Sequence, residues 1–286
     1  QAIHRHNDWP RITYIMKKLR SYGTIHLHLD LIVGLPYEDY THLRQSFNDI
    51  YALHPHKLQI GFLKLLKGSG IRRDYPNDYR YDPCGPYEVL ETTWLPYAKV
   101  RYMKVFEDVF ERTYNADKFV YVLNFLAEIY QADYFNLYER LTDEWLRLKN
   151  DEKALSDEHL CQFLWHCIQH VLALSPEQQQ TARELLILDM LTFFRFRYRL
   201  DFLEWEEAPR SETDAIFRDE AWLRQYVPDY AFTSWRDIKM RYRIWRVSQR
   251  TMQELQQYTE IPNQAAYILA EKQSHDTVWQ IIPEKN

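Results

Sequence analysis

The stretch HLDLIVGLPYEDYTHLRQSFNDIYALHPHKLQIGFLKLLKGSGI, residues 28–71, decides the fold of the first part of the chain. It becomes continuously apolar at residues 31–33 and stops at Gly34-Leu35-Pro36, as a strand buried on both faces of a parallel sheet does. Residues 39–53 then have apolar side chains at helical spacing, and residues 57–66 are typical of a second strand. Because a helix with short loops joins the two strands, we predict a right-handed βαβ unit, preceded by a helix over residues 8–20.

A proline- and aspartate-rich segment, residues 72–88, follows this unit and marks a boundary. The chain beyond it has helical periodicity, with many aromatic residues on the apolar faces. Ser156 and Ser175 are expected to cap two of these helices, because acidic residues follow each of them in the first turn. The predicted helices cover residues 88–113, 117–131, 134–149, 156–173 and 176–198.

The last part of the chain has a different pattern. Apolar and basic residues alternate over residues 238–244. The short apolar runs AAYILAE (265–271) and TVWQII (277–282) flank the turn-like Ser274-His275-Asp276. These patterns indicate a small C-terminal sheet.

Glycine is scarce and unevenly distributed. The 286 residues include only 6 glycines, and all of them lie within residues 1–85, whereas an average usage of about 7% would give roughly twenty. A complete (β/α) barrel needs glycine at many tight turns and roughly 250 residues, so only the N-terminal part can belong to one. We therefore predict an α+β, mainly α fold. Residues 1–74 would be the C-terminal part of a (β/α) barrel, and residues 75–286 a helical domain with a small C-terminal β-sheet.

The composition excludes several classes of protein. A net charge of −5 argues against general nucleic-acid binding, so no nucleic-acid partner is expected. Three cysteines form no even disulfide framework, which favours a reducing, cytoplasmic location. No apolar run approaches the length of about 18 residues that a membrane span needs, so no membrane partner is expected. The first residue is Gln1, and we expect the chain to be cut from a longer protein.

Ligands in α/β folds bind at the carboxyl ends of parallel strands, and here glycine follows both predicted strands. Gly34 lets a ligand approach the backbone, and Glu38 supplies an acceptor for an amine or a sugar hydroxyl. The alternative is a tight strand-to-helix turn at Gly34-Leu35-Pro36, with Glu38 near the start of the helix. Spacing alone favours this alternative.

The same stretch resembles the fifth strand, fifth helix and sixth strand of radical S-adenosylmethionine (radical SAM) enzymes. Their motif at this place runs Asp-Leu-Ile-x-Gly-Leu-Pro-Gly-Glu, and Tyr37 replaces its second glycine here. Further residues are similar to a subgroup with an N-terminal cobalamin-binding domain and a C-terminal helical domain of unknown function. The matching residues are Asp30, Leu31, Ile32, Gly34, Leu35, Pro36 and Glu38 for the motif, and Phe47, Asp49, Leu58, Gln59, Phe62, Leu63, Lys64, Leu66, Lys67 and Gly68 for the subgroup.

The resemblance covers residues 1–74 well and the remainder weakly. It implies that Gly34, Pro36 and Glu38 flank S-adenosylmethionine, and that Lys64 and Gly68 belong to the cofactor-binding end of the barrel. For Lys64 and Lys67, a solvated charge at the rim is an equally good interpretation. The resemblance implies no catalytic and no metal-binding residue in this chain.

The cysteines depart from the family. Radical SAM enzymes hold a [4Fe–4S] cluster with Cys-x3-Cys-x2-Cys, because three thiolates leave one iron open for the cofactor. Cys84, Cys161 and Cys167 do not have this spacing, and the first four strands are missing. The resemblance thus implies a fragment of a radical SAM oxidoreductase or methyltransferase that is inactive alone. S-adenosylmethionine, the cluster and, in this subgroup, cobalamin would bind to the intact protein, and none of them to the fragment.

The incomplete barrel also suggests partners. Two strands with open edges and an uncovered apolar face are prone to association. The expected partners are the missing N-terminal part of the same protein and, through the incomplete barrel face, a second copy of the chain.

A second cluster of chemically capable residues lies in the helix predicted over residues 156–173. His159, His166 and His170 fall near one face, with Cys161 and Cys167 close in sequence. Imidazole and thiolate suit zinc or iron. One helix rarely completes a coordination sphere, however, so we interpret these residues as ordinary helix residues.

Arginines alternate with aromatic residues in two places, at Arg195, Arg197 and Arg199 and between Arg236 and Arg250. Such residues can stack on bases and neutralise phosphates. The favoured interpretation is a solvated face that pairs with acidic residues such as Glu204, Glu206 and Glu207. The alternative function for the whole chain is therefore a non-catalytic helical interaction or RNA-binding module.

Overall fold

The computed structural model describes residues 8–150, 155–194, 201–203, 208–227, 233–262, 265–271 and 279–284. The chain divides into two compact units. The first consists of residues 1–117 and 127–153, and the second of residues 118–126 and 154–286.

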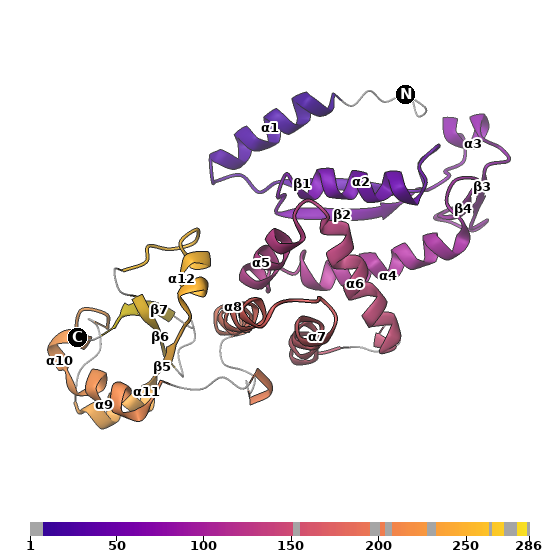
Figure 1. Ribbon diagram of the computed structural model, residues 1–286. Helices are drawn as coiled ribbons and strands as arrows, with labels where there is room; N and C mark the ends of the chain where they lie inside the picture. The colour runs from indigo at the N-terminus through magenta and orange to yellow at the C-terminus, as the bar shows by residue number, and fades with distance from the viewer. Residues whose placement is uncertain are drawn as a thin grey trace. The chain divides into compact units, whose positions relative to one another are not determined.

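The first unit begins with the predicted helix and βαβ unit (Figure 1). Helix α1 (Trp9–Ser21) leads into strand β1 (His28–Val33), helix α2 (Tyr40–Tyr51) and strand β2 (Lys57–Phe62). The two strands pair in parallel over their full length. Asp39 starts α2 by accepting a hydrogen bond from the backbone N–H of His42, at 2.9 Å. The predicted order of elements is confirmed here, although β2 ends at Phe62 and not at residue 66.

One face of the β1–β2 pair is buried more fully than the other. Leu31 and Leu58 are buried on that face, whereas Asp30 and Gln59, directly opposite each other in the register, are exposed. The prediction that the first strand is buried on both faces is therefore confirmed only near its carboxyl end, where Ile32 is half-buried against the cluster that contains Tyr79 and Val89. The uncovered face is also more polar than expected, because an aspartate and a glutamine stand at its centre.

The outer edge of β2 is partly closed by the loop after helix α4 (Tyr97–Thr113). The Asn115 side chain accepts a hydrogen bond from the Leu58 N–H at 3.1 Å and donates one to the Leu58 carbonyl at 3.0 Å. The Tyr114 hydroxyl donates to the carbonyl of Pro55. The amide of Asn115 thus replaces a neighbouring strand at this point, which protects an edge that would otherwise be open to pairing.

An aromatic core joins α2 to α4 and to helix α6 (Tyr134–Arg147). Phe47 lies at its centre, with ring centroids 5.3–5.5 Å from those of Phe106, Phe110 and Phe135 and nearly perpendicular planes. Edge-to-face pairs of this kind stabilise beyond their buried area. The first helices after residue 75 therefore pack on the βαβ unit as one core.

The proline-rich boundary segment contains structure that the sequence analysis missed. Helix α3 (Gly70–Asp74) leads into an antiparallel hairpin of strands β3 (Tyr79–Tyr81) and β4 (Val89–Thr92). The helix predicted over residues 88–113 therefore begins only at α4. The first residues of the predicted helix form β4 instead, because Val89 is buried in the hairpin. Pro96 directly precedes α4.

Helices α7 (Asp157–His170) and α8 (Pro176–Phe194) belong to the second unit, and helix α5 (Val120–Tyr130) begins in it. The predicted caps are confirmed, because the hydroxyls of Ser156 and Ser175 accept hydrogen bonds from backbone N–H groups of the following first turns. Residues 195–198, the predicted end of the α8 helix, lie outside the described residues.

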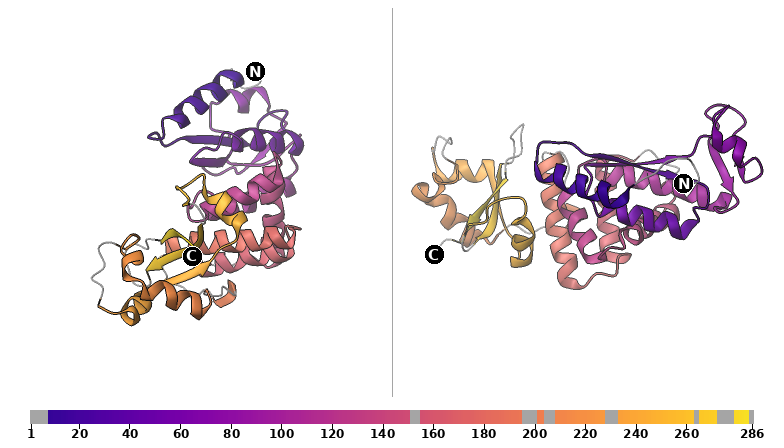
Figure 2. Two further views of the ribbon diagram at one scale, coloured as in Figure 1. Left: turned by 60° about the vertical axis from the view of Figure 1, so that its left-hand side comes forward. Right: turned by 90° about the horizontal axis from the view of Figure 1, so that it is seen from above.

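A small sheet lies near the C-terminus, as predicted. Its antiparallel strands lie in the order β5 (Tyr242–Arg246), β6 (Ala265–Glu271), β7 (Trp279–Pro283). Figure 2 shows its yellow strands beside short orange helices in both views. The alternation over residues 238–244 is only partly a strand, because its first residues belong to helix α11 (Trp235–Arg241). Ser234 starts this helix by accepting a hydrogen bond from the Asp237 N–H. The turn at residues 274–276 lies outside the described residues. The elements are η2 (Asp201–Leu203), α9 (Arg210–Arg218), α10 (Glu220–Leu223), α11 (Trp235–Arg241), β5 (Tyr242–Arg246), α12 (Gln249–Leu255), β6 (Ala265–Glu271) and β7 (Trp279–Pro283).

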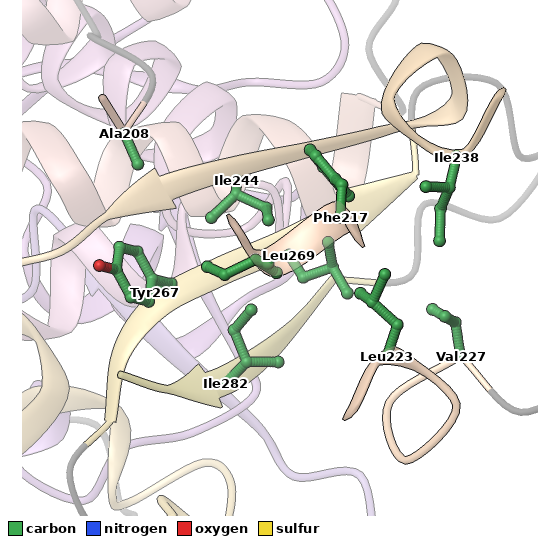
Figure 3. Packing of buried hydrophobic residues seen from close by; sticks show 10 residues of the cluster. Ala208, Phe217, Leu223, Val227, Ile238, Ile244, Tyr267, Leu269 and Ile282 are labelled. Carbon is green, nitrogen blue, oxygen red and sulfur yellow. The ribbon is translucent and has the colours of Figure 1, made fainter. Parts of the chain in front are cut away.

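Figure 3 shows how this sheet is buried, with side chains from all three strands meeting those of the short helices. Ile244, Leu269 and Ile282 come from the strands, and Phe217 and Ile238 from α9 and α11. The fold is thus a mainly helical α+β fold with small sheets, and the described residues form no barrel. Among these residues, no helix has both the length and the apolar character needed to span a bilayer.

Candidate ligand site at the carboxyl end of strand β1

A tight turn follows β1. The Glu38 N–H donates to the Leu35 carbonyl at 3.2 Å, with Pro36 and Tyr37 at the two central positions. Pro36 is buried, and Tyr37 has a positive φ of 65°. A turn of this type favours proline first and glycine second, because the second position needs φ above zero. Tyr37 therefore stands at the position where a glycine would be unstrained.

The ring of Tyr37 belongs to an aromatic cluster, defined here as Tyr37, Tyr75, Tyr79 and Trp94. The Tyr37 centroid lies 4.8 Å from that of Trp94 and 6.0 Å from that of Tyr75. Tyr79 lies 6.2 Å from Trp94 and 6.4 Å from Tyr75. These contacts offset the backbone strain at Tyr37, which is of the order of 1–2 kcal/mol. With 61% of Tyr37 exposed, the cluster presents an aromatic surface to solvent.

Gly34 faces the hairpin rather than open space. Its φ is +95°, and a Cβ atom placed on it would lie 3.0 Å from Cγ1 of Val89. The close approach that the sequence predicts at Gly34 is therefore made by a side chain of β4.

Glu38 is the half-buried acid of the turn. One carboxylate oxygen, Oε1, accepts a long hydrogen bond of 3.5 Å from the Ser46 hydroxyl. The other, Oε2, is buried and has no hydrogen-bond partner among the described residues. Burial raises the pKa of Glu38 to about 7, although hydrogen bonds to its carboxylate from the Leu35 backbone and from the Ser46 side chain act in the opposite direction. Near neutral pH the carboxyl group can thus either donate or accept a proton.

Tyr79 adds a second polar atom without a partner. Its side chain is 7% exposed, and its buried hydroxyl makes no hydrogen bond with the residues described. Burial raises the pKa of Tyr79 well above the usual range, and the charges of Tyr75, Asp78 and Glu38 add to this shift. Buried polar groups are normally paired, and such orphans point to a ligand group or water that would satisfy them. An amine or hydroxyl suits both atoms.

Lys64 and Gly68 lie on the segment after β2. Lys64 is exposed and forms an antiparallel bridge with Glu88 of the hairpin. Gly68 is exposed, has φ of +83°, and would have free space around a Cβ atom. The structure thus brings Gly34, Pro36 and Glu38 together in one turn, and the hairpin connects this turn to the Lys64 segment. Three residues of the cluster were not predicted, Tyr75, Tyr79 and Trp94, although the tyrosines of YPNDYRY at residues 75–81 were a usable signal.

The cysteines and histidines considered for metal binding do not converge. Cys161 and Cys167 are buried, Cys84 is exposed, and burial raises the pKa of the Cys161 thiol to about 12. The His159 ring is hydrogen-bonded to the Ser156 hydroxyl, and the ring centroids of His166 and His170 lie 5.0 Å apart. The described part of the chain holds no group of three or more residues that could bind a metal ion.

The basic patch between Arg236 and Arg250 is largely neutralised within its own unit. Arg246 pairs with Glu212 at 3.0 Å, and Arg250 with Glu254 at 2.7 Å. Lys239 pairs with Asp214. The alternating arginines at residues 195–199 and the acidic residues Glu204, Glu206 and Glu207 lie outside the described residues.

Comparison with known proteins identifies one family. A search of curated proteins finds no match. A family model described as "Protein of unknown function (DUF4080)" matches residues 75–269, which is more than half of the 286 residues. The match begins after the βαβ unit and includes the hairpin with Val89, Tyr79 and Trp94. The chain belongs to the DUF4080 family.

Proposed function

We propose that this chain is the C-terminal part of a radical SAM oxidoreductase or methyltransferase, with residues 1–74 as the end of its barrel. The observation that carries the proposal is the buried, unpartnered Oε2 of Glu38 at the carboxyl end of β1. This is the edge at which folds with parallel strands bind ligands. Support also comes from the parallel β1–β2 pair and from the motif residues that form the turn.

The residues present fit S-adenosylmethionine but not the cluster. Glu38 would accept a hydrogen bond from an amine or a ribose hydroxyl, and the Tyr79 hydroxyl would orient the same group. The three cysteines lack the spacing that a [4Fe–4S] site needs. When bound in the intact protein, the cofactor would supply radical chemistry through its one-electron reductive cleavage, with cobalamin as a further group. The ligands of the cluster would come from residues outside this chain.

The DUF4080 domain would shape the substrate side of this site. Its first residues contact this region twice, through Val89 of the hairpin beside Gly34 and through Trp94, just after the hairpin, beside Tyr37. A bound substrate would therefore meet the aromatic cluster on its way to Glu38. In this proposal the chain's own residues bind, orient and exclude water, and none of them performs the radical step.

The test uses the protein encoded by the complete reading frame, purified without oxygen and reconstituted with iron and sulfide. Dithionite and S-adenosylmethionine should yield 5′-deoxyadenosine, measured by chromatography. Glu38→Gln should weaken S-adenosylmethionine binding about tenfold, because a charge-assisted hydrogen bond contributes about 1.5–3 kcal/mol.

Glu91→Gln is the matched control, because Glu91 is a half-buried hairpin carboxylate that pairs with Arg80. It should leave the binding of S-adenosylmethionine unchanged. Absence of 5′-deoxyadenosine from a protein that holds its cluster would overturn the proposal. That result would favour the alternative, in which the DUF4080 domain is a non-catalytic interaction module.

A further inference from the structure

Arg72 of α3 carries a positive charge without a counter-ion among the described residues. Its Nη1 atom is buried and has no hydrogen-bond acceptor there. Neighbouring cations differ: Arg73 pairs with Asp74 at 2.8 Å, and Arg80 pairs with Glu91 at 3.3 Å. Arg72 therefore differs from these two arginines, whose charges are matched.

Two tyrosine rings hold the guanidinium in place. Its central carbon lies 4.9 Å from the centroid of Tyr81 and 5.8 Å from that of Tyr87. Such contacts favour a cation, yet a ring face cannot accept the in-plane hydrogen bonds that a guanidinium offers. A buried charge without such bonds is unfavourable. The arrangement fixes Arg72 and leaves one donor edge to be satisfied by another group.

A second cation approaches the same ring. Nζ of Lys67 lies 5.6 Å from the centroid of Tyr87, and the described structure gives Lys67 no ion pair. Lys67 and Arg72 flank the loop that follows the β2 segment, which includes Gly68 with free space beside its backbone. This loop lies after the carboxyl end of a parallel strand, where phosphate-bearing ligands bind in many folds.

We infer that Arg72 and Lys67 form a binding site for the phosphate group of a small molecule. Arg72 would donate in-plane hydrogen bonds from its fixed fork, and Lys67 would add a mobile point charge. A phosphate dianion matches these two cations, whereas a carboxylate would balance only one. The site differs from the Glu38 turn in its residues and charge, and it does not depend on radical chemistry.

The test is calorimetric titration of the 286-residue chain with sodium phosphate at pH 7.5, against sodium chloride of equal ionic strength. The wild-type chain should bind phosphate, and Arg72→Gln should weaken binding about tenfold or more, because charge-assisted donors are lost. Lys67→Gln should weaken it about threefold, as expected for a more exposed charge. Arg73→Gln is the matched control and should bind like wild type, because Arg73 is already paired with Asp74.

Arg72→Lys distinguishes the loss of a binding group from the loss of the fold, because it keeps the positive charge and removes only the planar set of guanidinium donors. Its phosphate affinity should fall between those of the wild type and Arg72→Gln, with an unchanged circular dichroism spectrum. Equal phosphate affinity in the wild type and Arg72→Gln would overturn the inference, as would acetate binding as tightly as phosphate. Absence of phosphate binding to the wild-type chain would overturn it too, and would leave the radical SAM proposal untouched.

Discussion

Val89 occupies the space beside Gly34, so closely that a Cβ atom on Gly34 would lie 3.0 Å from Cγ1 of Val89. The contact joins the carboxyl end of β1 to the first hairpin of the DUF4080 domain. The side chain of Val89, in the following domain, thus leaves room only for glycine at position 34 of the βαβ unit. The contact packs the hairpin against the residue that directly precedes the turn with Glu38.

We predict that Gly34→Ala destabilises the protein by about 2–4 kcal/mol, through strain at φ of +95° and crowding against Val89. Urea unfolding measures the loss. Gly70→Ala is the control and should change stability by less than about 1 kcal/mol, because its Cβ atom would make only an ordinary contact, at 3.6 Å. Adding Val89→Ala should relieve the crowding, so the double variant should lose less than the sum of the two single variants. Strict additivity would contradict the contact.

Glu38 makes stability depend on pH. Its pKa is raised from 4.5 to about 7 in the folded protein, so between these values the folded state binds more protons than the unfolded state. The stabilisation that comes from this extra bound proton is complete at low pH and is lost as the pH rises from about 4.5 to about 7. Because Glu38 is only partly buried, we expect a loss on the order of 2 kcal/mol.

The measurement is the free energy of unfolding in urea at pH 5 and pH 8, for the wild type and Glu38→Gln. The variant should lose less stability than the wild type between the two pH values, because an amide does not titrate there. Glu91→Gln should behave like the wild type. A Glu38→Gln variant with the full wild-type pH dependence would show that another group is responsible.

The elements that could be predicted from the sequence are those whose local pattern and tertiary surroundings agree. The run ending at Val33 and the helix starting after Asp39 contain their own signals, a continuous apolar stretch and a capping aspartate. The hairpin at residues 79–92 contains no such signal. Its short strands lie among prolines, and Tyr79 and Val89 become strand residues only because the βαβ unit offers a surface to bury them.

The candidate site follows the same division. Gly34, Pro36 and Glu38 are adjacent in sequence, so their grouping in one turn could be predicted. The roles of Tyr79 and Arg72 could not be predicted, because they depend on buried polar atoms that lack a hydrogen-bond partner among the described residues. A tyrosine and an arginine in a polar segment are ordinary residues until burial shows that their polar atoms are unsatisfied.

Asp189 of α8 caps α5 from another helix. Its two carboxylate oxygens accept hydrogen bonds from the backbone N–H groups of Tyr121 and Val122, both at 2.9 Å. We predict that Asp189→Asn costs about 2–4 kcal/mol, because an amide group has one acceptor oxygen and sets its NH2 against a donor. Hydrogen exchange should accelerate at these two amides. Asp157→Asn is the control, since its pair with Lys118 is partly exposed and contributes at most about 1 kcal/mol.

Asn115 provides the sharpest test of how the edge of β2 is protected. Its side chain both accepts from and donates to Leu58, and it is 6% exposed. Asn115→Asp keeps the acceptor and removes the donor, which leaves the Leu58 carbonyl unsatisfied and places a carboxylate against it. The expected cost is about 2–4 kcal/mol. Asn136→Asp, on the more exposed surface of α6, should cost less than about 1 kcal/mol.

If the edge of β2 needs this cover, the Asn115→Asp variant should also associate through β2 at high concentration, which sedimentation measures. A variant that associates no more than the wild type and is equally stable would show that the Asn115 bonds do not protect the strand.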